Sequence, residues 1–349
     1  MNARDAHRLG TSEELPAEYR EALTAAQLVP LWPHMRDALP YDAPRTRTVP
    51  TLWAWSKVRP LLLRAGELTP MDKAERRVLV LSNPGRGLEQ LQATSAMFLG
   101  MQLVLPGEVA PNHRHSPNAV RIVIEGEGGY TVVEGARCPM EHGDLVLTPS
   151  TLWHEHHHEG KGPLIWLDVL DLPVALALEV SYAISGAPQA QRPFQSRYAG
   201  GGLVPVVHGH RDRSRYPVMR YEWRRTQSAL EALAAGSDRG TPAILAYVNP
   251  ETGEDCMNTV AYSALMVRPG EEVKLPRISP SRVLHVVEGA GDAEISGVSM
   301  SFERSDTFCA PGLARVRLAN RSARAPLFLV IADESPVHRK LGYYEERPE

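Results

Sequence analysis

The segment from Gly107 to Asp168 constrains the fold of this chain more than any other, because it holds seven of the thirteen histidines. His113 and His115 form a His-x-His pair, and His154 follows after a Gly-Asp turn and a strand that ends at a proline. Side chains alternate across a β-strand, so the pair directs two imidazoles to one face. A small antiparallel barrel can bring the third histidine back beside them. The pattern therefore predicts a β-barrel that contains a three-histidine site.

Three imidazoles without a thiolate suit a divalent first-row metal, and three protein ligands leave coordination positions open for chemistry. A His-x-His pair also occurs by chance on exposed strands, and the run His156–His158 is compatible with a solvated loop. The joint spacing favours the metal site. Five residues separate Gly107 from the pair, five separate Gly143 from Pro149, and His154 follows that proline by five positions.

This spacing resembles both halves of the metal-binding cupin signature. The signature often places a glutamate shortly after the second histidine, where this chain has Ala119 and Val120. The predicted metal ligands are therefore His113, His115 and His154, without a carboxylate. One more coordination position is then open than in a site with four protein ligands.

The composition limits the possible partners and compartments. A net charge of −3 and an isoelectric point near 6.5, with both signs mixed along the chain, argue against a nucleic-acid partner. The three cysteines, Cys138, Cys256 and Cys309, are far apart, as is typical of a reducing cytosol. No apolar run approaches the roughly 20 residues of a membrane span, and no signal-peptide segment follows the N-terminus. We therefore expect a cytoplasmic protein with no membrane partner.

The chain divides into four predicted segments. Residues 1–90 form an N-terminal helical arm, with a short helix that opens at Thr69-Pro70 and runs through Arg77. Residues 91–175 form the metal-binding barrel, because short β-rich runs alternate there with glycine, proline and asparagine turns. Residues 176–240 form a linker that packs on both cores. Residues 241–349 form a second barrel and a C-terminal tail.

The second barrel is predicted from an internal repeat. The runs Ser263–Glu271, His285–Gly291 and Asp306–Pro311 repeat the runs Gly100–Glu108, Ile122–Gly128 and Asp144–Pro149. The ligand positions are lost in the repeat. Pro276 and Ile278 stand where the His-x-His pair stands, and Arg315 takes the place of His154. We expect the second barrel to fold without a metal, with His285 as a structural or hydrogen-bonding residue.

The chain as a whole resembles the gentisate 1,2-dioxygenase family, which includes dioxygenases of salicylate, substituted salicylates and 1-hydroxy-2-naphthoate. The motifs that carry the resemblance, in order, are Glu75-Arg-Arg-Val-Leu-Val-Leu-Ser-Asn-Pro-Gly, Pro106-Gly-Glu-Val-Ala-Pro-Asn-His-Arg-His, Thr148-Pro, Trp153-His-Glu-His, Tyr247-Val-Asn-Pro-Glu-Thr-Gly and Leu341-Gly-Tyr. The resemblance implies an all-β bicupin, that is, two double-stranded β-helix (jelly-roll) barrels with an N-terminal helical arm. It also implies Fe(II), O2 as co-substrate, and a homo-oligomer, commonly a tetramer.

The expected chemistry agrees with three histidine ligands. An ortho-hydroxybenzoate can occupy two of the three open positions through its carboxylate and phenolate, and O2 can occupy the third. The predicted reaction cleaves the C1–C2 bond of gentisate or a related salicylate and gives a ring-opened oxo-dicarboxylic acid such as maleylpyruvate. The sequence leaves open whether gentisate, salicylate, 5-nitrosalicylate or 1-hydroxy-2-naphthoate is the preferred substrate.

The candidate site residues beyond the metal ligands serve the substrate. Arg121 lies six positions beyond His115 and, on a strand without a bulge, shares its face, so it can grip a carboxylate. By family position Arg121 and Arg77 resemble substrate-carboxylate residues. His156 shares the strand face of His154 and is a candidate catalytic residue that Asp168 could orient. Two further residues of the preceding strand, Gln102 and Phe98, are expected to wall the pocket.

Two other classes of function stay open. One is a metal enzyme with different chemistry, such as a cupin isomerase or a dioxygenase of a non-aromatic acid. The other is a bicupin that binds a metal or ligand without catalysis. Arg121 and Arg77 beside a three-histidine site favour the ring-cleaving enzyme over both, since an anionic aromatic substrate needs cationic partners away from the metal.

Overall fold

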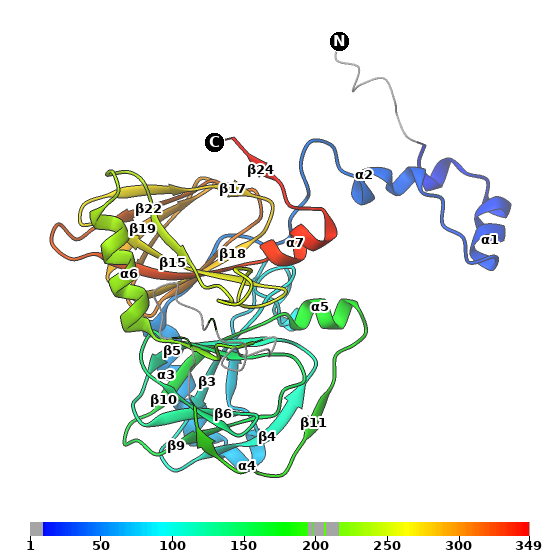
Figure 1. Ribbon diagram of the computed structural model, residues 1–349. Helices are drawn as coiled ribbons and strands as arrows, with labels where there is room; N and C mark the ends of the chain where they lie inside the picture. Colours follow the sequence, from blue (N-terminus) through cyan, green and yellow to red (C-terminus); the bar gives the residue numbers. More distant parts are fainter. Residues whose placement is uncertain (1–9, 195–197, 199–205, 207–215, 349) are drawn as a thin grey trace. The chain divides into compact units, whose positions relative to one another are not determined.

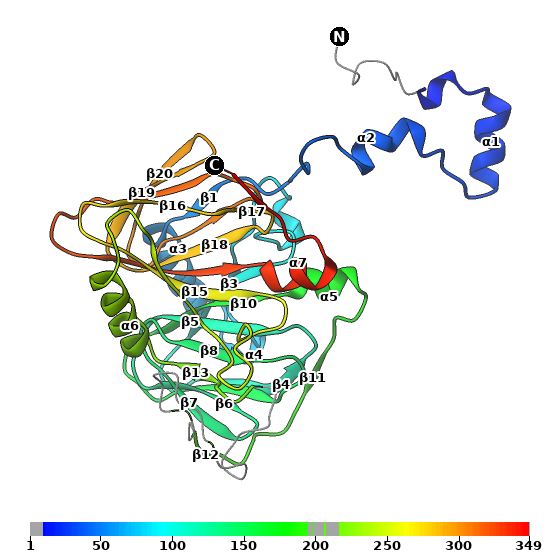
Figure 2. The same cartoon turned by 45° about the horizontal axis from the view of Figure 1, so that its top comes forward.

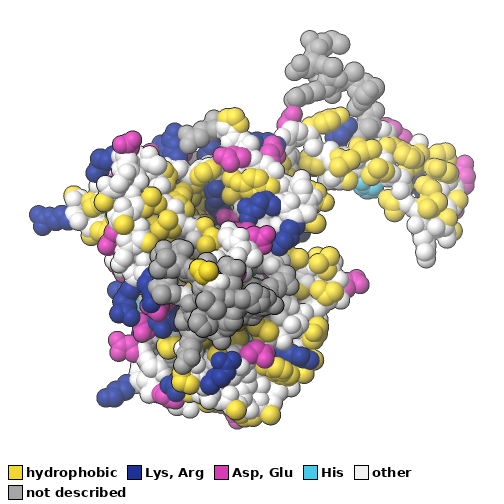
Figure 3. Space-filling model, viewed as in Figure 1, with side chains coloured by type: hydrophobic (Ala, Val, Ile, Leu, Met, Phe, Trp, Pro, Cys, Tyr) yellow, Lys and Arg dark blue, Asp and Glu magenta, His cyan; other side chains and the backbone are white. Residues whose placement is uncertain are grey.

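A computed structural model describes residues 10–194, 198, 206 and 216–348 and divides the chain into two compact units, residues 1–47 and 48–349. The first unit is helical, as expected for the arm. It contains η2 (Ser12–Glu14), α1 (Ala17–Ala25), η3 (Trp32–His34) and α2 (Met35–Ala38), none of which buries a side chain. Many of its hydrophobic side chains are exposed (Figure 3).

The second unit contains two barrels, each made of two sheets (Figure 1). The strands pair antiparallel, except for the parallel pairing of β12 with β7. In the first barrel one sheet has the order β13 (Arg220–Tyr221), β8 (Leu145–Thr148), β5 (Ala119–Glu125), β10 (Leu164–Leu170), β3 (Phe98–Val104) and β2 (Val78–Val80). The other has the order β11 (Ala183–Ser185), β4 (Val109–His115), β9 (His154–His158), β6 (Gly129–Val133), β7 (Ala136–Met140) and β12 (Arg192–Pro193). Apolar side chains of both sheets, among them Val123, Trp166 and Met140, pack together between them.

The second barrel repeats this arrangement. Its larger sheet has the order β1 (Thr51–Trp53), β21 (Thr307–Ala310), β18 (Arg282–Glu288), β23 (Leu327–Asp333), β15 (Ala261–Val267) and β14 (Ala243–Ala246). Its smaller sheet has the order β16 (Glu272–Leu275), β22 (Val316–Asn320), β19 (Ala290–Ile295) and β20 (Val298–Glu303), and β17 (Arg277–Ile278) pairs separately with β24 (Glu346–Arg347). The predicted all-β fold of two barrels is confirmed.

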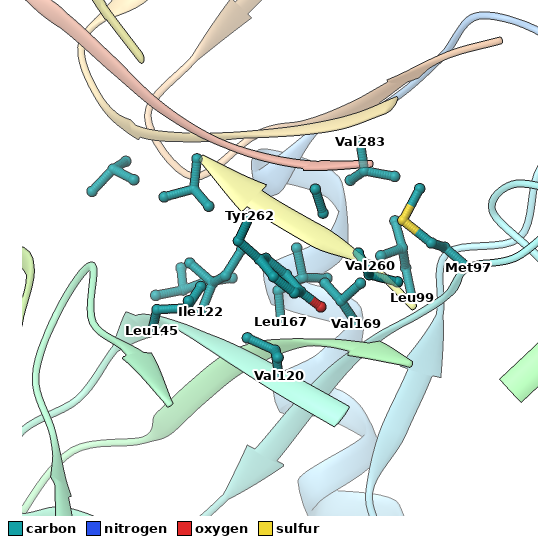
Figure 4. Close-up of a cluster of buried hydrophobic side chains, with 14 of the residues drawn as sticks. Met97, Leu99, Val120, Ile122, Leu145, Leu167, Val169, Val260, Tyr262 and Val283 are labelled. Carbon is teal, nitrogen blue, oxygen red and sulfur yellow. The ribbon is translucent and has the colours of Figure 1, made fainter. Parts of the chain in front are cut away.

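The two barrels share a hydrophobic interface. Figure 4 shows side chains of the first barrel, such as Ile122 and Leu167, packed against Tyr262 and Val283 of the second. Strand alternation explains this arrangement, because residues on one face of β5 and β10 point into the first barrel and those on the other face point to the interface. The sheet of each barrel that faces the other barrel is therefore covered on both faces. In the first barrel this sheet is a rigid platform for the side chains that point into the barrel.

Two strand-helix-strand segments connect the barrels, and each segment contributes one strand to each barrel. β1 pairs with β21 of the second barrel, and the chain then continues through α3 (Trp55–Leu68) to β2, which pairs with β3 of the first. β13 pairs with β8 of the first barrel and leads through α6 (Trp223–Ala235) to β14 of the second. The first N–H of α3 donates to Asp306 at 2.7 Å, and that of α6 donates to Asp144 at 2.9 Å. The internal repeat thus includes these strand-helix-strand units.

The boundaries of the four segments remain a prediction. The strand pairings show that the segments predicted as arm and linker also contribute strands to the barrels. β1 and β2 lie within residues 1–90, and β11, β12, β13 and α6 lie within residues 176–240. The remaining helices are α4 (Met71–Ala74), η4 (Leu88–Gln90), α5 (Leu172–Ala177) and α7 (Ser335–Leu341), as Figures 1 and 2 show in part. Across the described ranges, every helix is too short or too polar to span a membrane.

Candidate metal centre and substrate pocket

The three predicted ligand histidines lie together inside the first barrel. β4 and β9 are neighbouring antiparallel strands, and His113 pairs directly with His154 after a bulge in β4. The imidazole centroid of His113 lies 5.3 Å from that of His115 and 4.2 Å from that of His154, and the last two are 4.8 Å apart. One ring nitrogen of each residue lies within 4.8 Å of the others. This spacing allows one ion to contact all three rings.

Backbone carbonyls set the orientation of two of these rings. His115 Nδ1 lies 2.7 Å from the Pro117 carbonyl oxygen, and His154 Nδ1 lies 2.9 Å from that of Leu152. A carbonyl only accepts, so each Nδ1 carries the proton and each Nε2 keeps its lone pair. His154 Nε2 is buried and has no hydrogen-bond partner among the described residues. An orphaned lone pair of this kind fits a metal ligand.

The electrostatic surroundings keep the three imidazoles neutral. Burial lowers the pKa of His113 to about 3 and that of His115 to about 4, and it lowers the pKa of His154 well below its usual range. Nearby arginines, Arg76 and Arg121 among them, act in the same direction. Three neutral nitrogen donors without a thiolate or carboxylate suit a divalent first-row metal.

Arg121 lies inside the barrel, as predicted, and is paired with Asp168. The two residues are opposite each other on β5 and β10, and Arg121 Nε lies 3.2 Å from Asp168 Oδ1. Both are almost completely buried, and Arg121 also donates a hydrogen bond to Thr148. Burial raises the pKa of Asp168, although Arg121 opposes this shift. The pair places a cation beside the histidines and holds it in one orientation.

His156 also lies inside the barrel, but Thr131 orients it where Asp168 was expected to do so. His156 Nδ1 lies 2.9 Å from Thr131 Oγ1, whose hydroxyl lies 3.3 Å from Met140 Sδ. The His156 ring centroid lies 5.0 Å from that of Trp166, and its Nε2 is buried without a partner in the described part of the chain. Thr131 was not among the predicted site residues, because its place on β6 opposite His156 depends on the register between β6 and β9.

The two consecutive arginines occupy opposite faces. α4 ends at Ala74, well before Arg77, because Glu75 has a left-handed φ of 54° and the chain then becomes extended. Arg77 points away from the barrel interior and is buried in an ion pair with Glu108. No described contact joins it to the triad.

Arg76 therefore takes the place expected for its neighbour. Its Nη2 contacts the ring of His113, lies 3.3 Å from Nε2 of that ring, and donates to the Pro111 carbonyl at 2.6 Å. Burial lowers the pKa of Arg76 to about 10. Which of the two arginines faces the interior depends on where α4 ends, and the sequence pattern does not show that point. Arg76 and Val78 share a face, and Val78 lies against Gly100 inside the barrel.

β3 supplies the opposite wall of the pocket. Gln102 is paired with Trp166, is buried, and has an Nε2 group without a partner among the residues described. Phe98 is half-buried, and a Cβ added at Gly100 would lie 2.9 Å from its ring. Gly100, opposite Asp168, is therefore a second residue that the sequence analysis missed; only glycine leaves room there for the aromatic ring.

The second barrel has apolar side chains at the ligand positions, and the structure corrects two of the predicted correspondences. Ser296 N–H donates to the Arg315 carbonyl as Glu134 N–H donates to that of Trp153, so Arg315 does not take the place of His154. Val316 does, and it pairs with Leu275 as His154 pairs with His113. The counterpart of His113 in the pairing is thus Leu275, one residue before the predicted Pro276, because β16 lacks the bulge of β4. His285 is buried, with Nδ1 at 2.9 Å from Thr307 Oγ1.

Comparison with known proteins agrees with this geometry. A family model described as "Cupin domain" matches residues 100–170. The chain is 51% identical to a gentisate 1,2-dioxygenase from Ralstonia sp, over 98% of this chain and 97% of the relative. It is 36% identical to a 5-aminosalicylate 1,2-dioxygenase from Comamonas sp, over 94% and 88% of the two chains. The solved structure of salicylate 1,2-dioxygenase from Pseudoaminobacter salicylatoxidans with gentisate is similar with a TM-score of 0.87 and 30% identity, covering 99% of this chain and 96% of that one.

Proposed function

Since the chain belongs to the gentisate 1,2-dioxygenase family and is a ring-cleaving dioxygenase, we propose that it uses Fe(II) and O2 to cleave the C1–C2 bond of gentisate. The product would be maleylpyruvate, formed in aromatic catabolism. One observation carries the proposal: three neutral imidazoles, that of His154 buried and the other two partly buried, converge within 4.8 Å of one another, beside a buried arginine. A dianionic aromatic chelate needs this combination of open coordination positions and a fixed cation.

His113, His115 and His154 would hold the iron. When bound, Fe(II) supplies open coordination positions at which a chelating hydroxybenzoate and O2 come together. The protein contributes the orientation of the rings, since the carbonyls of Pro117 and Leu152 already direct Nε2 of two of them. The interior that surrounds the site is apolar apart from the named polar groups, which excludes bulk water from the reacting atoms.

Arg121 would bind the substrate carboxylate. Its guanidinium is desolvated, and Asp168 and Thr148 hold it so that little side-chain entropy is lost when a substrate binds. Arg76, two residues before β2, is the second candidate for binding the carboxylate. Its contact with His113 places it nearer to the metal ligands than Arg77. Gln102 and Phe98 would form the wall against which the ring lies.

His156 would accept a hydrogen bond from the substrate or from oxygen. If the Thr131 hydroxyl donates to Met140, its oxygen accepts from His156 Nδ1–H, and Nε2 keeps its lone pair. Burial lowers the pKa of His156 well below its usual range, so that the ring stays neutral. A neutral imidazole whose Nε2 has a free lone pair can accept a hydrogen bond from the substrate hydroxyl and so fix its position beside the metal ligands.

Oxygen consumption tests the function directly. Anaerobically purified protein is reconstituted with Fe(II), and kcat/KM is measured with an oxygen electrode for gentisate, salicylate, 5-nitrosalicylate and 1-hydroxy-2-naphthoate. We expect gentisate to be the preferred substrate and ring-opened product to equal the O2 consumed. Preference for another of the four would replace gentisate as substrate. Fully iron-loaded protein without O2 uptake on any of them would refute ring cleavage by this pocket.

We further propose a homotetramer in the cytoplasm. The three cysteines are free and buried, in keeping with a reducing compartment.

An exposed apolar surface over α5 and β11 is suited to a second copy of the chain, and Figure 3 shows hydrophobic side chains gathered there. Its exposed residues are Leu176, Leu178, Val180, Tyr182 and Ile184. We expect Ile184→Asp to lower the mass measured by light scattering, while Val298→Asp, at another exposed apolar position, leaves it unchanged; an unaltered mass in the first variant would remove this surface from the interface.

A further inference from the structure

We propose that Asp171, which follows β10, is a positioning residue for the metal centre. It would act through Asn118, which joins the two loops whose carbonyls orient His115 and His154. The inference rests on the proposed binding of a metal by the three histidines. It extends the site to a residue that contacts none of them, and it gives the second barrel a direct role in supporting the metal centre.

Asp171 is the acceptor for three converging donors. Its Oδ1 accepts from the backbone N–H of Asn118 at 2.7 Å, and its Oδ2 accepts from the Asn118 side-chain amide at 2.7 Å and from the Thr259 hydroxyl at 2.6 Å. Its own N–H lies 3.3 Å from the Asn118 carbonyl. The side chain is 5% exposed, so these bonds are shielded from competition by water. Asn118 is thereby fixed through its backbone and its side chain.

Asn118 connects the two loops that carry the orienting carbonyls. It directly follows Pro117, whose carbonyl accepts from His115 Nδ1 at 2.7 Å. Its side-chain oxygen accepts from the N–H of Ser150 at 3.0 Å. Ser150 opens the turn that leads to Leu152, the acceptor for His154 Nδ1 at 2.9 Å. One residue therefore ties together the groups that orient two of the three metal ligands.

The same turn is also bound to the ligand strand. The N–H of Thr151 donates to the His115 carbonyl at 2.8 Å, and Thr151 has a left-handed φ of 66°, which a threonine adopts only at a cost in free energy. The hydrogen bonds on either side of Thr151 must offset that cost. Loss of the Asn118 anchor would therefore let the turn relax, and the Leu152 carbonyl would move away from the His154 ring.

The second barrel supplies one of the three donors. Thr259 lies just before β15, and its hydroxyl reaches across the interface between the barrels to Asp171. The segment around it is fixed from the C-terminal side, since Lys340 Nζ donates to the Asn258 carbonyl at 2.6 Å. The barrel without histidine ligands thus holds part of the support of the metal site.

The internal repeat provides a matched control, because the second barrel has the same arrangement at Glu334. This residue follows β23 and accepts from Ser281 N–H at 3.1 Å, as Asp171 accepts from Asn118 N–H. It also accepts from the hydroxyl of Thr94, in the first barrel, at 2.5 Å, as Asp171 accepts from Thr259. The counterparts of His113 and His154 in the second barrel, Leu275 and Val316, are apolar. Glu334 therefore supports the fold in the same way but orients no histidine of the triad.

The test compares metal affinity in Asp171→Asn and Glu334→Gln. An amide offers one acceptor oxygen, so Asp171→Asn leaves at least one of the three donors facing another donor. Co(II) affinity is measured without oxygen or substrate by competition with a chromophoric chelator, and thermal stability is measured in parallel. We expect Asp171→Asn to weaken Co(II) binding about 10- to 100-fold, the usual effect of losing support behind a ligand, and to change the visible Co(II) spectrum. Glu334→Gln should lower the melting temperature but leave affinity within about twofold, since it alters no orienting group.

A second variant keeps the inference testable if Asp171→Asn does not fold. Asn118→Ala retains the backbone N–H bond to Asp171 but removes the link to Ser150, and we expect it to weaken Co(II) binding as well. Unchanged affinity in folded Asp171→Asn or Asn118→Ala would overturn the inference, as would an equal loss in Glu334→Gln, which would show that any loss of stability weakens the site. A wild-type protein that binds no Co(II) at the triad would instead refute the metal site itself.

Discussion

Replacing Arg121 by methionine affects both the proposed substrate role of this arginine and its structural role. Methionine fills similar space without charge, so the buried Asp168 loses the partner that lies 3.2 Å away. Removing one partner of a buried ion pair costs about 3–5 kcal/mol of stability. Losing a desolvated charge contact to the substrate carboxylate costs about 2–5 kcal/mol of binding free energy, which is at least about a thirtyfold drop in kcat/KM. Both effects are expected in the single variant, with the iron content unchanged.

The double variant Arg121→Met with Asp168→Asn resolves the two effects. It removes both charges, so we expect the free energy of unfolding to recover toward the wild-type value. The kcat/KM for carboxylate substrates should stay low, because nothing replaces the cation. Steady-state oxygen consumption and denaturant titration of iron-loaded proteins measure the two quantities separately. If the double variant regained wild-type kcat/KM, Arg121 would be a partner of Asp168 only, and the assignment to the substrate carboxylate would be wrong.

Three further outcomes follow from the site. His154→Ala should abolish iron binding and activity together, whereas His157→Ala should retain iron, since that ring is stacked on Tyr130 outside the triad; metal analysis of both variants decides this. Arg76→Ala should raise KM with little change in stability, while Arg77→Ala should unfold at lower denaturant because it leaves Glu108 unpaired; the reverse result would restore Arg77 to the pocket. His285→Gln should cost stability while iron stays at one per chain, and a second tightly bound iron in the wild type would contradict this.

The parts of the fold that depend on local pattern were predictable. Strand alternation places His113 and His115 on one face, and the glycine turns and the repeated runs indicate two barrels. These features need only the period of the strand and the order of the elements, which the sequence carries directly.

Features that depend on one residue of register were not predictable. Whether Arg76 or Arg77 enters the pocket is decided by where α4 ends, and a single left-handed residue, Glu75, sets that point. The bulge in β4 shifts the pairing by one residue, so Val316 pairs with Leu275 and not with Pro276. The correspondence of Val316 with His154 was itself predictable, because each residue follows a proline, Pro311 or Pro149, by five positions. A shift of one residue moves a side chain to the other face of a sheet, and sequence patterns seldom resolve it.

The exchange of strands between the barrels explains why a barrel without metal ligands is retained. β1 belongs to the second barrel, and α3 connects it to β2 of the first barrel. In the same way α6 connects β13 of the first barrel to β14 of the second. The predicted first barrel alone, residues 91–175, would lose β2 with Arg76 just before it, and the apolar face of the second barrel that covers the sheet of β5 and β10. It would also lose the Thr259 contact with Asp171. The metal centre therefore depends on both barrels, although its predicted ligands all come from one.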